Sequence, residues 1–385
     1  IIGRLIIGFN CGLNSGFVPM YLTEVSPINL RGTLGSVHQL VVTIAILISQ
    51  IIGLPYLMGN ERWWPLILAL TALPALFQVV TLPFCPESPK YSLIVKNRVE
   101  QAEKDLKKLR GRENVQEELD VMHEEAHAIK SVAKEELDVM HEEAHAIKSV
   151  AKVSMSDMFT VPALRWPMTI AIVMMLSQQL SGINAAMFYS TVIFRGAGLT
   201  GLAPFYATIG MGAVNVLMTI VSVYLVDHPR FGRRSLHLAG LGGMWLSSIL
   251  IVVCLSISEM GKTEPTGESK YQWASYMAIF FVLTFVVSFA TGPGSIPWFY
   301  VSEIFASGSR GNANSIAVMV NWTANFVVSV SFLPLNNAVG QFSFLLFVFF
   351  LTLCWLFTFK FVPETKGRTV EEIVQSFEER ARKNN

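Results

Sequence analysis

Nine long apolar segments constrain the fold of this chain more than any other feature of its sequence. A bilayer core about 30 Å thick requires roughly 20 apolar residues in a spanning helix. Lipid offers no partner to backbone N–H and C=O groups, so such segments must form helices that satisfy their own backbone. The sequence therefore predicts an all-α membrane protein with about nine spans, at residues 1–22, 35–57, 63–83, 166–194, 203–226, 236–258, 272–298, 312–335 and 341–361.

Composition and charge argue against the other broad classes of protein. Hydrophobic residues make up 52% of the 385 residues and the mean hydropathy is +0.47, which is too apolar for an ordinary soluble domain. A net charge of +1 gives no reason to expect nucleic acid as a partner. The four cysteines lie in or beside apolar stretches, where they act as small hydrophobic residues. The lipid bilayer is the first partner that the sequence predicts.

Positive charges in the short loops predict the orientation of the chain. Lys and Arg gather on the cytosolic side of membrane proteins. The loops that share one side of the predicted bundle carry Arg31, Arg230, Arg233, Arg234, Arg310, Lys366 and Arg368. We therefore expect these loops, the linker at 88–165 and the C-terminus in the cytosol.

An internal repeat divides the chain into two related halves. The pattern E-x6-R-G runs from Glu24 to Gly32 and again from Glu303 to Gly311, and Pro86–Lys90 is echoed by Pro363–Lys366. Six spans follow the linker and three precede it, so the repeat predicts a six-plus-six design whose first three helices are absent here. We expect a second half of an N-terminal bundle at 1–87, a cytosolic helical linker at 88–165, a C-terminal six-helix bundle at 166–361 and a cytosolic tail at 362–385.

The linker contains an 18-residue tandem duplication, because residues 117–134 recur identically as 135–152. Eighteen residues complete five helical turns, so the second copy preserves the phase of a helix. It is either a recent duplication or a flaw of the sequence record. His123–His127 and its copy His141–His145 match the H-E-x-x-H pattern of zinc proteases. No third protein ligand is evident, so we interpret both as the solvated face of a charged helix and predict no metal site.

Polar residues inside the predicted spans are the candidates for function, because each is costly in lipid and faces a cavity or another helix. They are mostly neutral amides, which offer both donors and acceptors and suit an uncharged solute with many hydroxyls. Their alternative role is to hydrogen-bond neighbouring helices together. The residues are His38, Gln39, Gln178, Gln179, Asn184, Asn215, Asn321 and Asn325.

A series of short motifs runs through nearly the whole chain. They are Gly3-Arg4, Pro19-Met20-Tyr21, Glu24–Pro27 with Arg31-Gly32, Pro86–Pro89, Gln178–Asn184, Gly232–Arg234, Gly292–Gly294 with Pro297-Trp298, Asn321–Thr323 and Pro363–Arg368. In this order they resemble the sugar-porter branch of the major facilitator superfamily, above all the animal facilitative glucose transporters. The resemblance implies a twelve-helix fold whose first three helices are the ones absent here.

The resemblance also implies roles for particular residues. A sugar site would be lined by Gln39, Gln178, Gln179, Asn184, Asn215, Trp298 and Asn321. Gating would involve Phe188, Tyr189, Gly292, Pro293 and Gly294. A cytosolic charge cluster that clamps the two halves together would comprise Glu24, Arg31, Glu87, Asp227, Arg233, Glu303, Arg310 and Glu364.

Three positions depart from the family pattern. Met175-Leu176-Ser177 stands where Gln-Leu-Ser is usual in the family, which weakens the case for glucose over fructose. Ala290 stands where a glutamate is common, so one member of the charge network is replaced. The loop from Asp227 to Arg234 is longer than the family pattern.

The function that the sequence predicts is facilitative uniport of a hexose, D-glucose in the first place, by alternating access in the plasma membrane. Such a carrier is not an enzyme and needs no cofactor or metal. Two alternatives stay open at this stage. One is a proton-coupled sugar symporter, and the other is a non-transporting sugar sensor or an inactive fragment.

Overall fold

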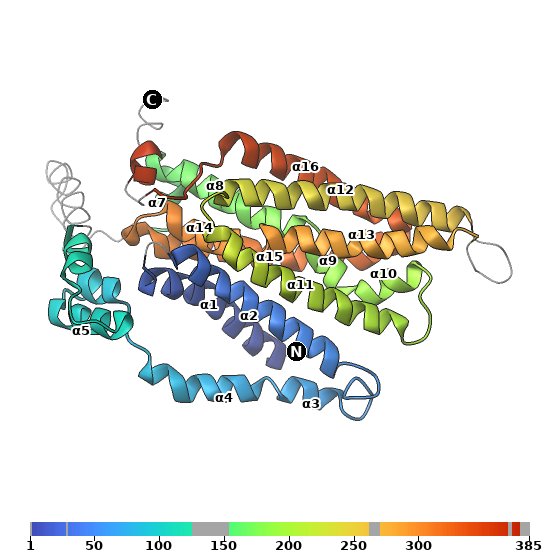
Figure 1. The fold of residues 1–385 in the computed structure, drawn as a ribbon, viewed down its shortest axis with the longest axis horizontal. Helices are drawn as coiled ribbons and strands as arrows, with labels where there is room; N and C mark the ends of the chain where they lie inside the picture. The colour runs from blue at the N-terminus through green and yellow to red at the C-terminus, as the bar shows by residue number, and fades with distance from the viewer. Residues whose placement is uncertain (1, 28–29, 125–153, 262–269, 369–371, 378–385) are drawn as a thin grey trace.

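The computed structural model describes residues 2–27, 30–124, 154–261, 270–368 and 372–377. In these residues every regular element is a helix, and the long helices run side by side in one elongated bundle (Figure 1). The predicted all-α membrane fold is confirmed.

The first half of the bundle consists of three membrane passes. They are α1 (Ile2–Val25), α2 (Arg31–Ile52) and the pair α3 (Trp64–Ala69) and α4 (Ala72–Thr81) with the 3-10 turn Leu82–Phe84. The second half follows the linker. Its helices are α8 (Pro162–Leu180), α9 (Ile183–Phe188), α10 (Ser190–Gly196), α11 (Ala203–Asp227), α12 (Arg233–Met260), α13 (Gln272–Thr291), α14 (Ile296–Ile304), α15 (Ser307–Val339) and α16 (Ser343–Phe361).

Eight stretches of the described residues are long and apolar enough to cross a membrane. The last, Gly308–Phe361, has 54 residues. A helix of that length would extend about 80 Å, which is far more than the bilayer core. It turns back at Gly340, whose φ of 55° lies in the left-handed region. This stretch holds both α15 and α16, so the described residues make nine passes.

Two predicted spans are broken helices rather than continuous ones. The span predicted at 166–194 turns at Gly182, where φ is 88°, and continues as α9 and α10. The span predicted at 272–298 ends its first helix at Thr291 and resumes as α14 at Ile296. Pro293, which has no backbone N–H, lies in this second break. Periodicity in apolar residues cannot reveal such breaks, because the segment stays hydrophobic on both sides.

The buried core lies mainly in the second half. Its span Pro162–Phe188 has 67% of its most apolar window buried, whereas the spans of α1, α2 and α3–α4 have 11%, 17% and 0%. Two large clusters of buried hydrophobic residues fill this half, one around Phe299 and Tyr300 and one around Phe344 and Phe347. The second half therefore provides the rigid frame on which the candidate site is built.

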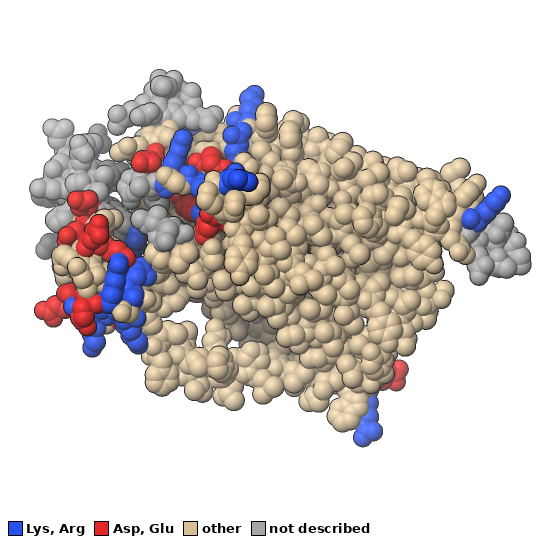
Figure 2. Space-filling model, viewed as in Figure 1, with Lys and Arg blue, Asp and Glu red and all other residues tan. Residues whose placement is uncertain are grey.

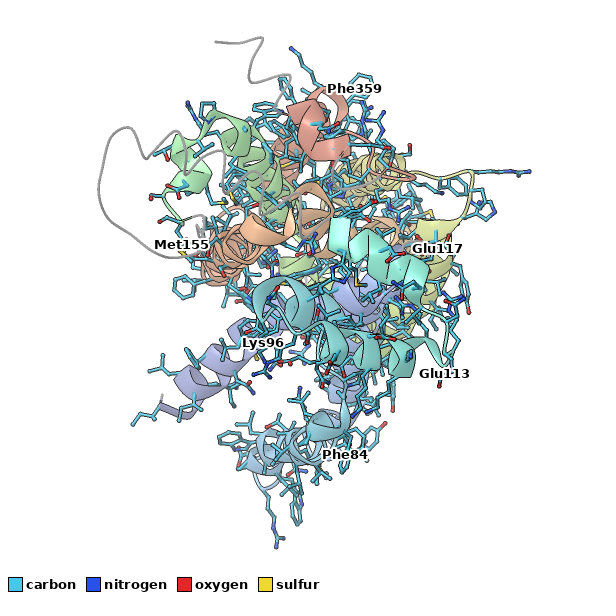
Figure 3. All side chains as sticks on the ribbon, turned by 90° about the vertical axis from the view of Figure 1, so that its left-hand side faces the viewer. Phe84, Lys96, Glu113, Glu117, Met155 and Phe359 are labelled. Atoms are coloured by element: carbon cyan, nitrogen blue, oxygen red, sulfur yellow. The ribbon has the colours of Figure 1, made fainter. Side chains whose placement is uncertain are left out.

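The linker begins with a small helical unit attached to the first half (Figure 3). Helix α5 (Val99–Arg110) packs against the helical residues 116–124. Their shared core is a cluster of buried hydrophobic residues, namely Leu93, Ala102, Leu106, Val115 and Met122. Arg110 Nη1 donates to the carbonyl of Val25 at 2.9 Å, and Lys108 Nζ donates to that of Phe84 at 3.0 Å. These bonds satisfy carbonyls at the ends of α1 and the third pass.

Most of the duplicated segment, with His127 and the second H-E-x-x-H pattern, lies outside the described residues. Among the described residues no three His, Cys, Asp or Glu side chains are grouped so that they could hold a metal ion.

Charged side chains gather at one end of the bundle, beside α5 and the loop after α11 (Figure 2). We call this end, where α1 stops at Val25 and α11 stops at Asp227, the inner end. The middle of the bundle presents an uncharged surface in the same view. This distribution suits a protein whose middle lies in lipid and whose inner end faces water.

Candidate functional site

Four amide side chains from α8, α9 and α15 form one buried cluster in the second half. Gln179 Nε2 donates to Asn321 Oδ1 at 2.9 Å, and Asn321 Nδ2 donates to Gln178 Oε1 at 2.7 Å. Asn184 Nδ2 donates to Gln179 Oε1. Gln178, Gln179 and Asn321 are 3%, 6% and 1% exposed. We call Gln178, Gln179, Asn184 and Asn321 the amide cluster.

The break at Gly182 is what places Asn184 in the amide cluster. After Gly182 the chain changes direction, so that Asn184 at the start of α9 faces back toward Gln179 at the end of α8. The ring of Phe347 packs where a side chain on Gly182 would lie, with its Cδ2 2.5 Å from an ideal Cβ position. Both the backbone conformation and the packing therefore require glycine here.

The amide cluster is also tied to the break between α13 and α14. Gln178 Nε2 donates to the carbonyls of Pro293 and Gly294, at 3.0 and 2.9 Å. The break lies directly against α12, because a Cβ on Gly240 would collide with the Pro293 ring. Two of the predicted gating residues, Pro293 and Gly294, are thus in contact with the predicted sugar site through one side chain.

Three further candidate residues lie on other helices. Asn215 on α11 is 2% exposed, and its Oδ1 has no hydrogen-bond partner among the described residues. Trp298 on α14 is 7% exposed and meets His38 of α2 edge to face, with ring centroids 5.7 Å apart. Gln39 is half-buried and follows His38 on α2. In the described part of the chain, no hydrogen bond joins Asn215, Trp298 or Gln39 to the amide cluster.

The predicted gating pair after α9 is split between two environments. Phe188 is 59% exposed. The Tyr189 hydroxyl donates to the carbonyl of Ser329 at 2.9 Å, and the Tyr189 ring packs against Phe332 with centroids 5.2 Å apart. Tyr189 therefore joins the turn after α9 to α15, whereas Phe188 contributes apolar surface.

Part of the predicted charge cluster lies within the second half. Arg233 Nη2 is 3.0 Å from Asp227 Oδ1, and Arg233 Nε is 3.5 Å from Glu303 Oε1. Glu364 accepts the backbone N–H groups of Arg233 and Arg234 at 2.8 and 3.1 Å. A carboxylate at the start of α12 complements the positive end of that helix.

Another part joins the two halves. The backbone N–H and hydroxyl of Thr33 on α2 both donate to Asp227 Oδ2 at 2.6 Å. Arg310 Nη1 lies 3.9 Å from Glu24 Oε1. Asn314 Nδ2 donates to the carbonyl of Gly16 at 2.7 Å. These contacts close the inner end of the bundle.

Two members of the predicted cluster are not placed in it. Glu87 pairs instead with Lys96 of the linker at 2.7 Å, and its side chain is 45% exposed. The side chain of Arg31 lies outside the described part of the chain.

The internal repeat has an atomic counterpart. Tyr21 donates to the carbonyl of Pro86 and Tyr300 to that of Pro363, both at 2.7 Å. Ser88 donates to Glu24, and its counterpart Thr365 donates to Glu303 at the same distance of 2.6 Å. The tyrosines belong to a Y-x-x-E pattern that ends on the first residue of each E-x6-R-G motif. Ser88 and Thr365 belong to the repeated motifs Pro86–Lys90 and Pro363–Lys366.

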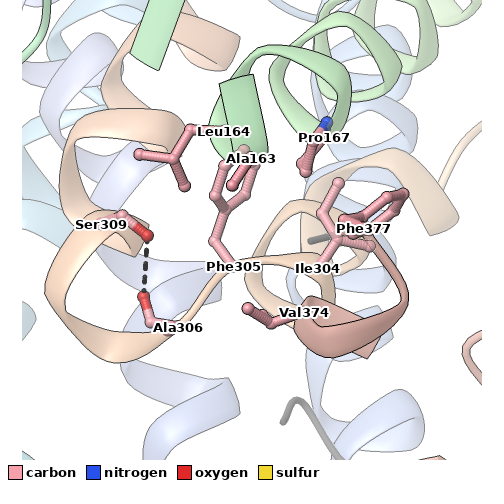
Figure 4. A pocket seen from close by; sticks show the side chains of 9 residues that line it. All are labelled: Ala163, Leu164, Pro167, Ile304, Phe305, Ala306, Ser309, Val374 and Phe377. Carbon is pink, nitrogen blue, oxygen red and sulfur yellow. Dashed lines mark hydrogen bonds between the residues drawn. The ribbon is translucent and has the colours of Figure 1, made fainter. Parts of the chain in front are cut away.

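A small apolar cavity lies at the inner end between α8, α14, α15 and the helical residues 372–377 (Figure 4). Its volume of about 40 Å³ is well below the ~300 Å³ at which ligand pockets begin. Phe305 and Phe377 line it. It is not the place for a sugar.

Comparison with known proteins decides the family. The family model described as "Sugar (and other) transporter" matches residues 1–377. The chain belongs to this transporter family. Its members are transporters and not enzymes, so the predicted family and the absence of an enzymatic role are confirmed.

Two named relatives are similar to this transporter in sequence. It is 59% identical to Facilitated glucose transporter protein 1 of Caenorhabditis elegans over 380 residues, covering 99% of this chain and 69% of the relative. It is 45% identical to Solute carrier family 2, facilitated glucose transporter member 3 of Ovis aries over 378 residues, covering 98% and 70%.

Solved structures of a bacterial transporter share the fold. The major facilitator superfamily proton:xylose symporter XylE bound to 6-bromo-6-deoxy-D-glucose matches with a TM-score of 0.77 and 26% identity, over 98% of this chain and 73% of XylE. The inward-open conformation of XylE from E. coli matches with a lower TM-score of 0.58 and 27% identity, over 93% and 68%.

Proposed function

We propose that this protein is a facilitative hexose uniporter that works by alternating access, with D-glucose as the first substrate to test. The observation that carries the proposal is the amide cluster, a group of neutral donors and acceptors buried within a membrane-spanning bundle. The names of the relatives support sugar as the solute.

The chemistry of the candidate residues suits a neutral sugar. Amide groups can donate to and accept from hydroxyls without a net charge to desolvate. The orphaned Oδ1 of Asn215 adds an acceptor for a sugar hydroxyl. The indole of Trp298 offers an apolar face for the C–H groups of a pyranose ring.

Within the described spans, the positions of the carboxylates are compatible with uncoupled transport. The Asp and Glu residues of the described spans, namely Glu24, Asp227, Glu259 and Glu303, lie near helix ends. Proton relays in transporters use ionisable groups within the membrane. The competing candidate is proton-coupled symport, which the similarity to the proton:xylose symporter favours.

Alternating access would use the contacts between the halves at the inner end. The bonds from Thr33 to Asp227 and from Arg310 to Glu24 would form when this end is closed and break when it opens. We further propose that the transporter resides in the plasma membrane, with the 88–165 linker and the C-terminus in the cytosol. The basic loops at the inner end support this orientation.

The test is uptake of radiolabelled D-glucose into proteoliposomes that contain the full chain. A uniporter equilibrates the sugar without concentrating it and is insensitive to a protonophore. Uptake against a gradient that collapses with the protonophore would establish symport instead. Sugar binding without any uptake would favour the sensor.

A pair of variants tests the site in the same assay. Gln179→Leu leaves buried amide groups unpaired, at about 1–3 kcal/mol per group, so the apparent affinity should fall by up to about a hundredfold. Gln116→Leu removes an exposed linker amide that bonds only to Asp120, and uptake should be unchanged. Equal affinity in the Gln179→Leu and wild-type proteins would leave the cluster as helix-to-helix bonding alone.

A further inference from the structure

The hydrogen-bonding capacity of Gln178 is fully used in this structure. Both N–H groups of its amide are directed to the carbonyls of Pro293 and Gly294. Its Oε1 accepts from Asn321 at 2.7 Å and from Gln179 at 3.4 Å. An amide offers two donors and an oxygen with two lone pairs, so nothing is left over for a ligand.

The segment that Gln178 holds is the start of α14, and α14 closes the inner half of the bundle. All residues from Ile296 to Ile304 are buried. Phe299 packs so closely on α2 that an ideal Cβ on Gly35 would lie 2.8 Å from its Cβ. Trp298 contacts His38 of the same helix. Opening of the inner end requires α14 to separate from these α2 residues of the first half.

Gln178 is itself anchored to a third helix. The preceding Ser177 is 3.1 Å from His237 Nε2 of α12, and both side chains are buried. Gly292 lies against the same turn of α12, where its Cβ would be 2.8 Å from His237 Cα. The end of α8 and the break before α14 are therefore fixed against one rigid helix, with Gln178 bridging between them.

We propose that Gln178 is a positioning residue that couples sugar binding to the release of α14. This inference rests on the proposed function, because it assigns a specific task to one residue of the same site. A sugar hydroxyl can accept an N–H of Gln178 only if that N–H leaves a carbonyl of the break. Sugar binding and the hold on α14 therefore compete for the same two donors.

Gln179 is the matched control for this role. It follows Gln178 directly at the end of α8, before the turn at Gly182. It has the same side chain as Gln178 and is nearly as buried. Its amide bonds only to the side chains of Gln178, Asn184, Asn321 and Asn325, and none of its bonds reaches the α13–α14 break. Loss of Gln179 should weaken sugar binding without releasing α14.

The experiment measures the separation of the two halves at the inner end by electron paramagnetic resonance. Spin labels replace Lys104, exposed on the linker helix α5, and Arg230, exposed in the loop between α11 and α12. The exposed Cys11 and Cys85 are changed to serine. The full chain is reconstituted in lipid nanodiscs, and the distance distribution is recorded with and without D-glucose.

Without sugar, Gln178→Met should raise the ratio of open to closed molecules by roughly tenfold to a hundredfold, since it removes two hydrogen bonds to the break. Gln178→Asn, which keeps the amide but is one methylene too short, should shift the ratio in the same direction. Gln179→Met should leave the sugar-free distribution as in wild type. Added glucose should shift wild type toward the open state and shift Gln178→Met much less.

Sugar-free distributions that coincide for wild type, Gln178→Met and Gln178→Asn would overturn the inference, provided that all three elute as monodisperse protein. So would an equal shift in Gln178→Met and Gln179→Met. The sugar-free comparison does not depend on transport. If the protein does not transport glucose, the proposed function is refuted. The sugar-free distance distributions still decide the role of Gln178.

Discussion

Replacement of Gly182 by alanine tests how the amide cluster is positioned. Gly182 combines a φ of 88° with close packing of the Phe347 ring, which is 3% exposed. The left-handed conformation costs an L-residue about 1–2 kcal/mol. The added methyl group lies 2.5 Å from an atom of this buried ring, and such overpacking costs about 1–3 kcal/mol. The two terms together predict a destabilisation of about 2–5 kcal/mol.

Two other glycines separate these terms. Gly201→Ala has a φ of 62° and no heavy atom within 4 Å of the new Cβ, so it carries the backbone term alone. Gly196→Ala has neither a positive φ nor a neighbour within 4 Å and should be neutral or slightly stabilising. Thermal unfolding of the purified variants in detergent should therefore rank them as Gly196→Ala, Gly201→Ala and then, well below, Gly182→Ala.

A functional measurement completes the test. Because Gly182 turns α9 so that Asn184 meets Gln179, Gly182→Ala should also weaken hexose binding, whereas Gly201→Ala should not. Equal melting temperatures for Gly182→Ala and Gly201→Ala would refute the packing argument. A Gly182→Ala protein with wild-type stability would refute the left-handed conformation as well.

Three further predictions follow from other parts of the molecule. Glu24→Gln removes a partly buried ion pair between the halves worth about 1 kcal/mol, so spin labels at the inner end should report roughly a fivefold rise in open molecules. Asn321-Trp322-Thr323 is formally a glycosylation sequon, yet Asn321 is 1% exposed, so glycosidase treatment should produce no mass shift that Asn321→Gln abolishes. Deletion of residues 135–152 removes five helical turns without changing helix phase, so hexose uptake at equal surface expression should be unchanged.

The sequence predicted the residue types of the candidate site better than their partners. Gln178, Gln179 and Asn184 stood out because amides are costly in an apolar span, and they do lie together with Asn321. The bonds from Gln178 to the carbonyls of the break could not be predicted, because every residue has a carbonyl and none marks the sequence. The helix breaks themselves depend on one glycine conformation and one proline within otherwise uniform apolar segments.

The charge cluster shows the same limit. The E-x6-R-G repeat identified Glu24 and Glu303 as equivalent residues, and their hydroxyl partners Ser88 and Thr365 confirm that equivalence at the level of single bonds. The pattern did not indicate that Thr33 would be a partner of Asp227. A threonine at the start of a helix is common for local reasons, so its long-range contact leaves no separate signal.

The arrangement of bonds at the inner end accounts for how it can be both closed and reversible. Bonds within each half, such as Thr365 to Glu303 and Arg233 to Asp227, are short and shielded, so they hold the half together as a unit. Between the halves, the Arg310 to Glu24 pair is long at 3.9 Å and Glu24 is partly exposed to solvent, where ion pairs contribute little. Separation of the halves breaks this pair together with the bonds from Thr33 to Asp227 and from Asn314 to Gly16, and it preserves the bonds within each half, which is the condition for a rigid-body motion. The exception is α14, which Gln178 fixes by bonds within the second half to the carbonyls of Pro293 and Gly294. These bonds must break for the inner end to open.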